Sequence, residues 1–412
     1  MPKLLQINIT ANWGSHGKIA EGIGRLALQQ GWESHIAYGR YANPSQSQLY
    51  HIGSMADEYW HVAETRLFDR HGLGSKRVTR QLVDYIRQLA PDVIHLHNIH
   101  GYYLNYPLLF RYLEEAGVPV VWTLHDCWAF TGHCAHYMST GCTLWQTACH
   151  HCQLTHSYPK SLWADRSARN FEDKKRAFLS VEKMTIVPVS HWLEQEVRLS
   201  FLQQRPIRQI YNGINVALFS PQGDSAAVLS KYGIPQDKKM VLGVASKWYR
   251  QKGLDDFSIL RERLGDDYVI VMVGLNKKQA ANLPAGVVGI ERTNDTHELA
   301  CLYSAANVFF NPTWEDNFPT TNLEALACGT PVVTYRTGGC AECINENNGF
   351  VVDQGDMDSA CLHIKEICSQ RKEDFQDTCR NYILSSFNED DRYQDYINLY
   401  LSLISHQNVQ RP

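Results

Sequence analysis

The chain has 412 residues, of which 44% are hydrophobic and 20% are charged, and its formal net charge is −4. This apolar content is ample for a buried core, and the length exceeds that at which one core usually divides, so we expect two domains. The balanced charge argues against a disordered chain and against a non-specific nucleic-acid binder.

The N-terminus and the apolar runs indicate which cellular location to expect for the protein. The first eight residues read as a short strand, without the apolar core and cleavage site of a signal peptide. No apolar run approaches the ~20 residues that span a bilayer. We therefore expect a cytoplasmic protein that is free to contact the inner face of the membrane peripherally.

Short apolar runs alternate with helix-like segments in the N-terminal half. A strand at 4–9 and a glycine-bearing loop at 12–18 precede a predicted helix at 19–30, which ends at Gly31. Further strands are predicted at 34–38, 92–97, 119–124, 185–189 and 207–211. Strands separated by helices indicate a parallel sheet that is covered on both faces.

The C-terminal half repeats this pattern after a turn at 211–215. Strands are predicted at 240–245, 268–273, 287–290, 308–311 and 331–335, and a helix at 322–327 stops before Gly329. A last helix at 389–404 carries one apolar face, so it should pack on another part of the protein. The pattern predicts an α/β protein made of two doubly wound halves.

Ligands of open α/β sheets bind beyond the carboxyl ends of the strands, so residues that follow strands are candidates for binding. The first candidate segment follows the first strand and contains Gly14, Ser15, Gly17 and Lys18. Its glycines would let the backbone approach a phosphate at a helix N-terminus. It matches neither the dinucleotide fingerprint nor the P-loop, so a simple tight turn is an equally good interpretation.

Two lysines, Lys247 and Lys252, follow the strand at 240–245. As point charges they could hold a diphosphate, although a solvated basic loop is the better reading of an isolated lysine pair.

An acidic segment follows the strand at 308–311. Asp316 and Glu324 are separated by residues at which a helix would begin, Asn317, Phe318, Pro319, Thr320 and Thr321. The free amides of such a helix could bind an anion, and the carboxylates could accept hydrogen bonds from hydroxyls of a sugar and a ribose. From spacing alone, acidic residues that only cap a helix remain an equal alternative.

Several motifs in the same order resemble the family 4 retaining glycosyltransferases. Asp316 and Glu324 occupy the acidic places of the family's E-x7-E motif, and 325–333 match its A-x-A-x-G-x-P-V-V. Lys247 and Lys252 occupy the basic places of R-x4-K-G, and 212–215 resemble its N-G-I-D turn. Segment 338–342 resembles G-G-x-x-E, and 123–126 resemble the segment with the family's active-site histidine, here His125. The similarity is strongest to the colanic-acid and O-antigen type of transferase.

The resemblance implies the GT-B fold, in which two Rossmann-like domains face each other across a cleft. We expect an acceptor domain at 1–214 with a cysteine-rich insertion at about 127–160. A donor domain would follow at 215–388, and the helix at 389–412 would cross back to the N-terminal domain.

The resemblance also implies transfer of a sugar, with retention, from a UDP- or GDP-linked donor to a glycan or lipid-linked oligosaccharide in O-antigen or exopolysaccharide biosynthesis. Lys247 and Lys252 would neutralise the leaving diphosphate, Asp316 would bind the donor sugar, Glu324 the ribose, and His125 would orient a substrate. No cofactor is required in this scheme. Two places depart from the family, because Asp316 is shorter than glutamate and Lys247 cannot bind phosphate bidentately as arginine does.

Four of the twelve cysteines lie close together in the sequence: Cys134, Cys142, Cys149 and Cys152. Four thiolates suit a tetrahedral structural Zn²⁺, and histidines 133, 136, 150 and 151 are possible substitutes. Four reduced thiols in a compact loop are the alternative.

Two other functions remain open at this stage. The departures at Lys247 and Asp316 would suit a catalytically weak scaffold that binds nucleotide-sugar, and a sugar-nucleotide epimerase uses a similar fold. A basic group in the N-terminal half could favour an anionic membrane surface, although it also reads as an ordinary solvated helix face; it comprises Arg66, Arg70, Lys76, Arg77 and Arg80.

Overall fold

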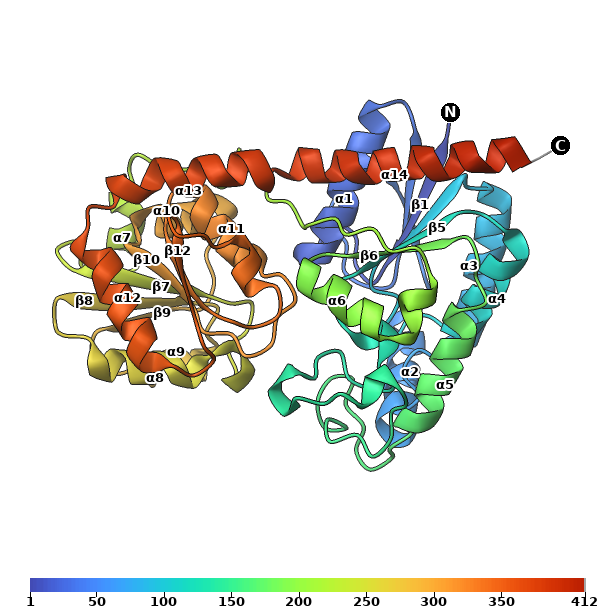
Figure 1. Ribbon diagram of the computed structural model, residues 1–412, viewed down its shortest axis with the longest axis horizontal. Helices are drawn as coiled ribbons and strands as arrows, with labels where there is room; N and C mark the ends of the chain where they lie inside the picture. Colours follow the sequence, from blue (N-terminus) through green and yellow to red (C-terminus); the bar gives the residue numbers. More distant parts are fainter. Residues whose placement is uncertain (411–412) are drawn as a thin grey trace. The chain divides into compact units, whose positions relative to one another are not determined.

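The computed structural model describes residues 1–410, which form two compact units. The N-terminal unit comprises residues 1–211 together with the chain from Asp390 onward, and the C-terminal unit comprises Asn212–Glu389. Each unit contains one six-stranded parallel sheet, and helices lie around both sheets (Figure 1). The two sheets confirm the predicted α/β class with two doubly wound halves.

The sheet of the N-terminal unit has the strand order β3-β2-β1-β4-β5-β6. Its strands are β1 (Lys3–Asn8), β2 (Glu33–Tyr38), β3 (Gln48–His51), β4 (Val93–Leu96), β5 (Val120–Leu124) and β6 (Met184–Pro188). The helices of this unit are α1 (Gly14–Gln29), α2 (Met55–Phe68), α3 (Lys76–Leu89), α4 (Tyr106–Ala116), α5 (Ser167–Phe178), α6 (His191–Leu199) and α14 (Glu389–Gln410).

The sheet of the C-terminal unit has the order β12-β11-β10-β7-β8-β9. Its strands are β7 (Lys239–Val244), β8 (Tyr268–Val273), β9 (Val287–Ile290), β10 (Val308–Asn311), β11 (Val332–Tyr335) and β12 (Gly349–Val352). Its helices are α7 (Ala226–Lys231), α8 (Leu254–Arg263), α9 (Lys277–Ala280), α10 (Thr296–Ala305), α11 (Thr320–Ala327), α12 (Met357–Ser369) and α13 (Glu373–Ser386).

The strand orders define where each unit can bind a ligand. In the N-terminal sheet the order reverses between β1 and β4, and in the C-terminal sheet it reverses between β10 and β7. Loops that leave neighbouring strands at such a point diverge to opposite faces and leave a crevice beyond the carboxyl ends of the strands. Ligand-binding residues are therefore expected in the loops after β1, β4, β7 and β10.

The last helix, α14, packs on the N-terminal unit. Tyr393, Tyr396, Ile397 and Tyr400 join the hydrophobic core that contains residues of α1, β1, β4 and β5. Tyr393 lies against Gly22 of α1, where any Cβ would collide with the tyrosine ring. Figure 1 shows α14, in red, running past α1.

The structure differs from the sequence prediction at four elements. The segment 207–211 is not a strand, because only Ile207 forms an isolated bridge to β6, which ends at Pro188 with no N–H to extend the ladder. Two edge strands, β3 and β12, were not predicted, since neither has a long apolar run. The helix expected at 19–30 begins at Gly14, so the predicted loop at 14–18 is its first turn.

Candidate functional site

The loops after β7 and β10 pack against each other at the reversal point of the C-terminal sheet. A short 3-10 turn, Arg250–Lys252, ends at Gly253, which has a φ of +79°. A Cβ at Gly253 would collide with the carbonyl oxygen of Pro312, and the Trp314 N–H donates to the Gln251 carbonyl at 2.8 Å. The Lys-Gly sequence thus allows the lysine-bearing loop to lie directly on the acidic loop.

This packing brings Lys252 and Asp316 together. The Lys252 Nζ lies 2.6 Å from the Asp316 Oδ2 and donates to the Glu315 carbonyl at 3.0 Å. Burial is the largest single influence and disfavours the ammonium form of Lys252, but the charge of Asp316 and its hydrogen bond, with smaller contributions from neighbours, outweigh burial and raise the pKa of Lys252 above its ordinary value. The two residues, which the sequence assigned to separate roles, form one ion pair at the carboxyl ends of the strands.

Lys247 lies on the same loop as Lys252 but is exposed. The next residue, Trp248, is buried, and its indole N–H donates to the Val273 carbonyl at 2.8 Å. Trp248 anchors the beginning of this loop to the end of β8, which leaves the Lys247 side chain accessible to solvent.

Helix α11 begins directly after the acidic loop, with Pro319 as its N-cap residue. The Gly338–Gly339 turn closes over this loop: the Gly339 N–H donates to the Asn317 carbonyl at 3.0 Å, and a Cβ at Gly338 would collide with the Asp316 carbonyl. The loop is therefore held rigidly at the N-terminus of α11, where unpaired amides and the helix dipole favour an anion.

Glu324 lies on the second turn of α11 and is partly exposed. Its Oε2 accepts a hydrogen bond from the Tyr303 hydroxyl at 2.9 Å. Burial is the main cause that raises the pKa of Tyr303, and the charge of Glu324 raises it further. A carboxylate oriented in this way can accept hydrogen bonds from hydroxyl groups of a ligand.

The glycine-bearing segment of the N-terminal unit forms the first turn of α1. Gly14, Ser15 and Lys18 are exposed, whereas Gly17 is buried close to the Thr10 hydroxyl, which lies 2.6 Å from the position of a Cβ. The segment thus places a helix N-terminus beyond the end of β1, as an anion site requires. It belongs to a different unit from Lys252 and Asp316.

His125 follows β5 and lies in a group of histidines. Its ring is 5.6 Å from the ring of His97 and 5.9 Å from that of His16. Burial, together with the neighbouring histidines, holds the pKa of His125 well below its ordinary value, so the ring is neutral. A small hollow of about 10 Å³ is lined by His125, His97 and neighbouring residues of the β4 and β5 ends.

Next to His125, Asp126 and His100 form a buried pair. The His100 Nε2 lies 2.7 Å from the Asp126 Oδ2, and its Nδ1 lies 3.0 Å from the Tyr158 hydroxyl. Burial disfavours the carboxylate of Asp126, but the interactions with His100 outweigh it and lower its pKa. His16, His97 and His100 were not predicted as site residues. The sequence signal that could have identified two of them is the run of histidines at 95, 97 and 100, where a strand ends.

The cysteine group lies in a loop region without long helices between β5 and α5. The thiols of Cys134 and Cys152 are hydrogen-bonded to each other, and the Cys149 Sγ accepts the Gly132 N–H at 3.1 Å. Within residues 1–405, whose side chains the structure describes, no three side chains of His, Cys, Asp or Glu lie close enough together to hold a metal ion. The zinc site stays a prediction, which elemental analysis of the purified protein tests.

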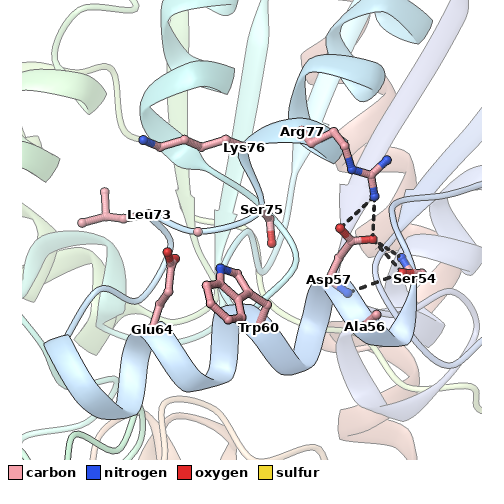
Figure 2. Close-up of a pocket in the computed structure, with 10 residues that line it drawn as sticks. Ser54, Ala56, Asp57, Trp60, Glu64, Leu73, Ser75, Lys76 and Arg77 are labelled. Atoms are coloured by element: carbon pink, nitrogen blue, oxygen red, sulfur yellow. Dashed lines mark hydrogen bonds and ion pairs between the residues drawn. The ribbon is translucent and has the colours of Figure 1, made fainter.

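A larger hollow, of about 420 Å³, lies between α2 and the start of α3. Figure 2 shows Trp60 and Glu64 of α2 below Lys76, with Arg77 bonded to Asp57 at the other end. None of the predicted catalytic residues lines this hollow.

Comparison with known proteins gives matches over most of the chain. A family model described as Glycosyltransferase Family 4 matches residues 20–218, and one described as Glycosyl transferases group 1 matches residues 226–383. A protein of Escherichia coli (strain K12) described as a colanic acid biosynthesis glycosyl transferase, WcaC, is 27% identical over 376 residues, which cover 86% of this chain and 88% of that protein. A D-inositol 3-phosphate glycosyltransferase of Corynebacterium jeikeium is 32% identical over 36% of this chain and 40% of its own length.

Solved structures resemble the whole fold at low sequence identity. Sucrose-phosphate synthase of Thermosynechococcus elongatus has a TM-score of 0.72 and 17% identity, with coverage of 98% of this chain and 100% of its own. The Anabaena protein HepE, in complex with UDP, has a TM-score of 0.66 and 14% identity over 98% of this chain and 100% of its own. These likenesses concern the fold alone.

Proposed function

Because the chain belongs to the group 1 glycosyltransferases and has the GT-B fold, we propose that it transfers a sugar from a nucleoside-diphosphate sugar to a glycan or lipid-linked oligosaccharide. The proposed pathway class is surface polysaccharide biosynthesis, of the O-antigen or exopolysaccharide kind. Similarity to the colanic acid protein supports this class, and the complex of HepE with UDP supports a nucleoside-diphosphate sugar, UDP- or GDP-linked, as the donor.

The observation that carries the proposal is the position of Lys252 at the reversal point of the C-terminal sheet. Its ammonium group is held beside the N-terminus of α11 by Asp316 and by the Glu315 carbonyl. Negative charge develops on the leaving diphosphate as the glycosidic bond breaks, so a cation and free amides fixed there stabilise the transition state more than the ground state. Lys247 supplies a second cation from the exposed part of the same loop.

The remaining polar groups have proposed roles in binding. Glu324 accepts hydrogen bonds from the ribose, and Asp316 from hydroxyls of the donor sugar, while the backbone from Asn317 to Thr321 contacts sugar and phosphate. The first turn of α1, with Gly14, Ser15, Gly17 and Lys18, contributes amides to the donor from the N-terminal unit. His125, as a neutral imidazole, orients a substrate hydroxyl.

We propose a retaining reaction in which the acceptor hydroxyl attacks from the face that the diphosphate leaves. The bond between the anomeric carbon and the diphosphate oxygen breaks, the acceptor oxygen bonds to that carbon, and the acceptor proton passes to the departing phosphate. The chain's own groups position the two substrates and stabilise the diphosphate, and the scheme requires no cofactor.

We also propose that the N-terminal unit contacts an anionic membrane surface through α2. Trp60 and Tyr59 are 69% and 66% exposed, whereas the residues that α2 buries are His61 and Thr65. Trp163 is 74% exposed. The segment that carries it is tied to the end of α2 by a hydrogen bond of 2.8 Å from the Leu162 N–H to the Arg66 carbonyl. The helix therefore presents its large apolar side chains to solvent.

The charges around α2 favour anionic lipids. Asp57 pairs with Arg77 and Glu58 with Arg40, so these carboxylates are neutralised. Arg66 of α2 and Lys76 and Arg80 of α3 are exposed, and each such cation near an anionic surface is worth about 1 kcal/mol. Within residues 1–410 no helix is long and apolar enough to cross a membrane, so this contact would be peripheral.

A donor screen tests the proposed function. Purified protein is incubated with common UDP- and GDP-sugars, with and without a lipid-linked acceptor, and release of free nucleoside diphosphate is measured. A transferase releases UDP from one donor only when the acceptor is present. A scaffold would bind nucleotide without release, and an epimerase would change the sugar without any acceptor.

A further inference from the structure

The buried amide of Gln6 on β1 has only one possible orientation. Its Nε2 lies 2.7 Å from the carbonyl oxygen of Ala20 on α1, and a carbonyl oxygen can only accept, so this atom must be the N–H group. Gly24 gives the amide room against α1, since a Cβ at that position would lie 3.3 Å from the Gln6 Nε2. The Gln6 Oε1, an acceptor, therefore faces the Nε2 of His97 at 3.0 Å.

This orientation fixes the proton on His97. An acceptor at 3.0 Å requires that the His97 Nε2 carry a hydrogen. The imidazole is buried at the end of β4, and burial holds its pKa well below the ordinary value. The neighbouring titratable groups that lower this pKa further are His95 and His16. A neutral ring with its proton on Nε2 has a lone pair on Nδ1, and this atom lies 3.3 Å from the Nε2 of His125.

From these contacts we infer that Gln6 and His97 are positioning residues that hold His125 as the Nε2–H tautomer, so that its Nδ1 acts as a hydrogen-bond acceptor. An acceptor nitrogen can receive a hydrogen bond from a sugar hydroxyl, whereas it cannot donate one to a phosphate. The inference rests on the proposed function only for the identity of the substrate group, because the tautomers follow from the contacts of the protein itself.

The groups around His125 are consistent with a neutral ring. His97 faces it from β4, His16 from α1, and His100 from the loop after β4. The carboxylate of Asp126 also acts on the ring. Its Oδ2 lies 2.7 Å from the His100 Nε2, and its Oδ1 accepts a hydrogen bond from the Trp128 N–H at 2.9 Å. The carboxylate is thus engaged by His100 and the Trp128 amide, and burial is the largest influence that lowers the pKa of His125.

Nitrogen NMR of the intact protein with ¹⁵N-labelled histidine tests the inference without any activity assay. We expect His97 and His125 both to be neutral and protonated on Nε2 from about pH 6 to 8, where an unperturbed histidine would titrate. A proton on the Nδ1 of either ring, or titration of either ring in that range, would overturn the inference whether or not the protein is a transferase.

Paired variants test the consequence for turnover. In His97→Asn the side-chain carbonyl can still accept from the His125 Nε2–H, whereas His97→Leu removes the acceptor. We expect kcat of His97→Leu to fall at least tenfold below that of His97→Asn, with a smaller change in KM. Gln6→Met should lower kcat and give a mixture of His125 tautomers. Gln30→Met, at the exposed C-cap position of α1, should change neither. Equal kcat in the two His97 variants would contradict the inference.

Discussion

Lys252 shows at the scale of a residue how one side chain can be both structural and functional. Its ammonium group is paired with Asp316 and is also the cation that lies beside the start of α11. A pair of this kind, partly buried, keeps the lysine charged and fixed before any ligand arrives, so no reorganisation is needed when a diphosphate leaves.

Replacement of Lys252 by alanine should slow the transfer reaction. We expect a loss of about 2 kcal/mol or more in transition-state stabilisation, the amount that one fixed donor to a developing anion supplies. The measurement is kcat/KM from release of nucleoside diphosphate. Lys278→Ala, which removes an exposed lysine of α9 in the same unit, is the matched control and should leave kcat/KM unchanged. Near-normal turnover in Lys252→Ala would remove the proposed role.

The pH dependence of Asp316→Asn should reveal the ion pair. In the wild type the pKa of Lys252 is raised, so the pair's contribution to stability is fully present below the ordinary lysine pKa and is lost as the pH rises through the raised value. Without Asp316, burial remains the largest influence and lowers that pKa. The activity of the variant should therefore decline at a lower alkaline pH than that of the wild type, measured as kcat/KM against pH. If the alkaline parts of the two pH profiles coincide, the pair does not set the charge of Lys252.

At the scale of elements, the sequence predicted strands best where burial is greatest. The strands at 268–273 and 308–311, which are buried throughout, were predicted with their observed bounds, since parallel strands covered on both faces are almost wholly apolar. The edge strand at 287–290 is only partly buried, and its short apolar run was enough to predict its bounds. The edge strand Gln48–His51 is polar and mostly exposed, so periodicity gives it no signal. The contacts of His97 with Gln6 and of Lys252 with Asp316 join residues far apart in the chain, and spacing alone cannot predict them.

The packing of α14 on α1 depends on the absence of a side chain at Gly22. Gly22→Ala would place a methyl group against the Tyr393 ring, and such overpacking typically costs 1–3 kcal/mol, roughly the range for an added methyl group in a packed core. Thermal unfolding should show a lower midpoint for this variant. Gly265→Ala, where nothing lies within 4 Å of the added Cβ, is the control. An unchanged midpoint in Gly22→Ala would show that α14 does not need this close approach.

Binding to vesicles tests the role of α2. The full chain should sediment with vesicles that contain phosphatidylglycerol and less with vesicles of phosphatidylcholine alone, because both apolar and electrostatic contacts are needed for stable attachment. Trp60→Ser and Lys76→Glu should each reduce sedimentation. Leu362→Ser, which alters an exposed leucine of α12 in the C-terminal unit, should not. Equal sedimentation of all variants, or none for the wild type, would contradict the proposal.

At the scale of the whole molecule, two units of the same architecture divide the proposed work. The C-terminal unit carries Lys247, Lys252, Asp316 and Glu324, and the N-terminal unit carries His125 and the first turn of α1. Chain length and the repeated alternation of strands and helices predicted this duplication, whereas assignment of the two roles came from resemblance to a family. The identity of the donor sugar and the acceptor depends on side-chain contacts that neither periodicity nor motif spacing encodes.

The position of a bound nucleoside diphosphate tests the central claim most directly. A crystal structure of the protein with UDP should place the diphosphate within hydrogen-bond distance of the Lys252 ammonium group and of the first amides of α11, with the ribose hydroxyls at Glu324. UDP bound away from the loops after β7 and β10, or an empty site at saturating UDP, would contradict the account.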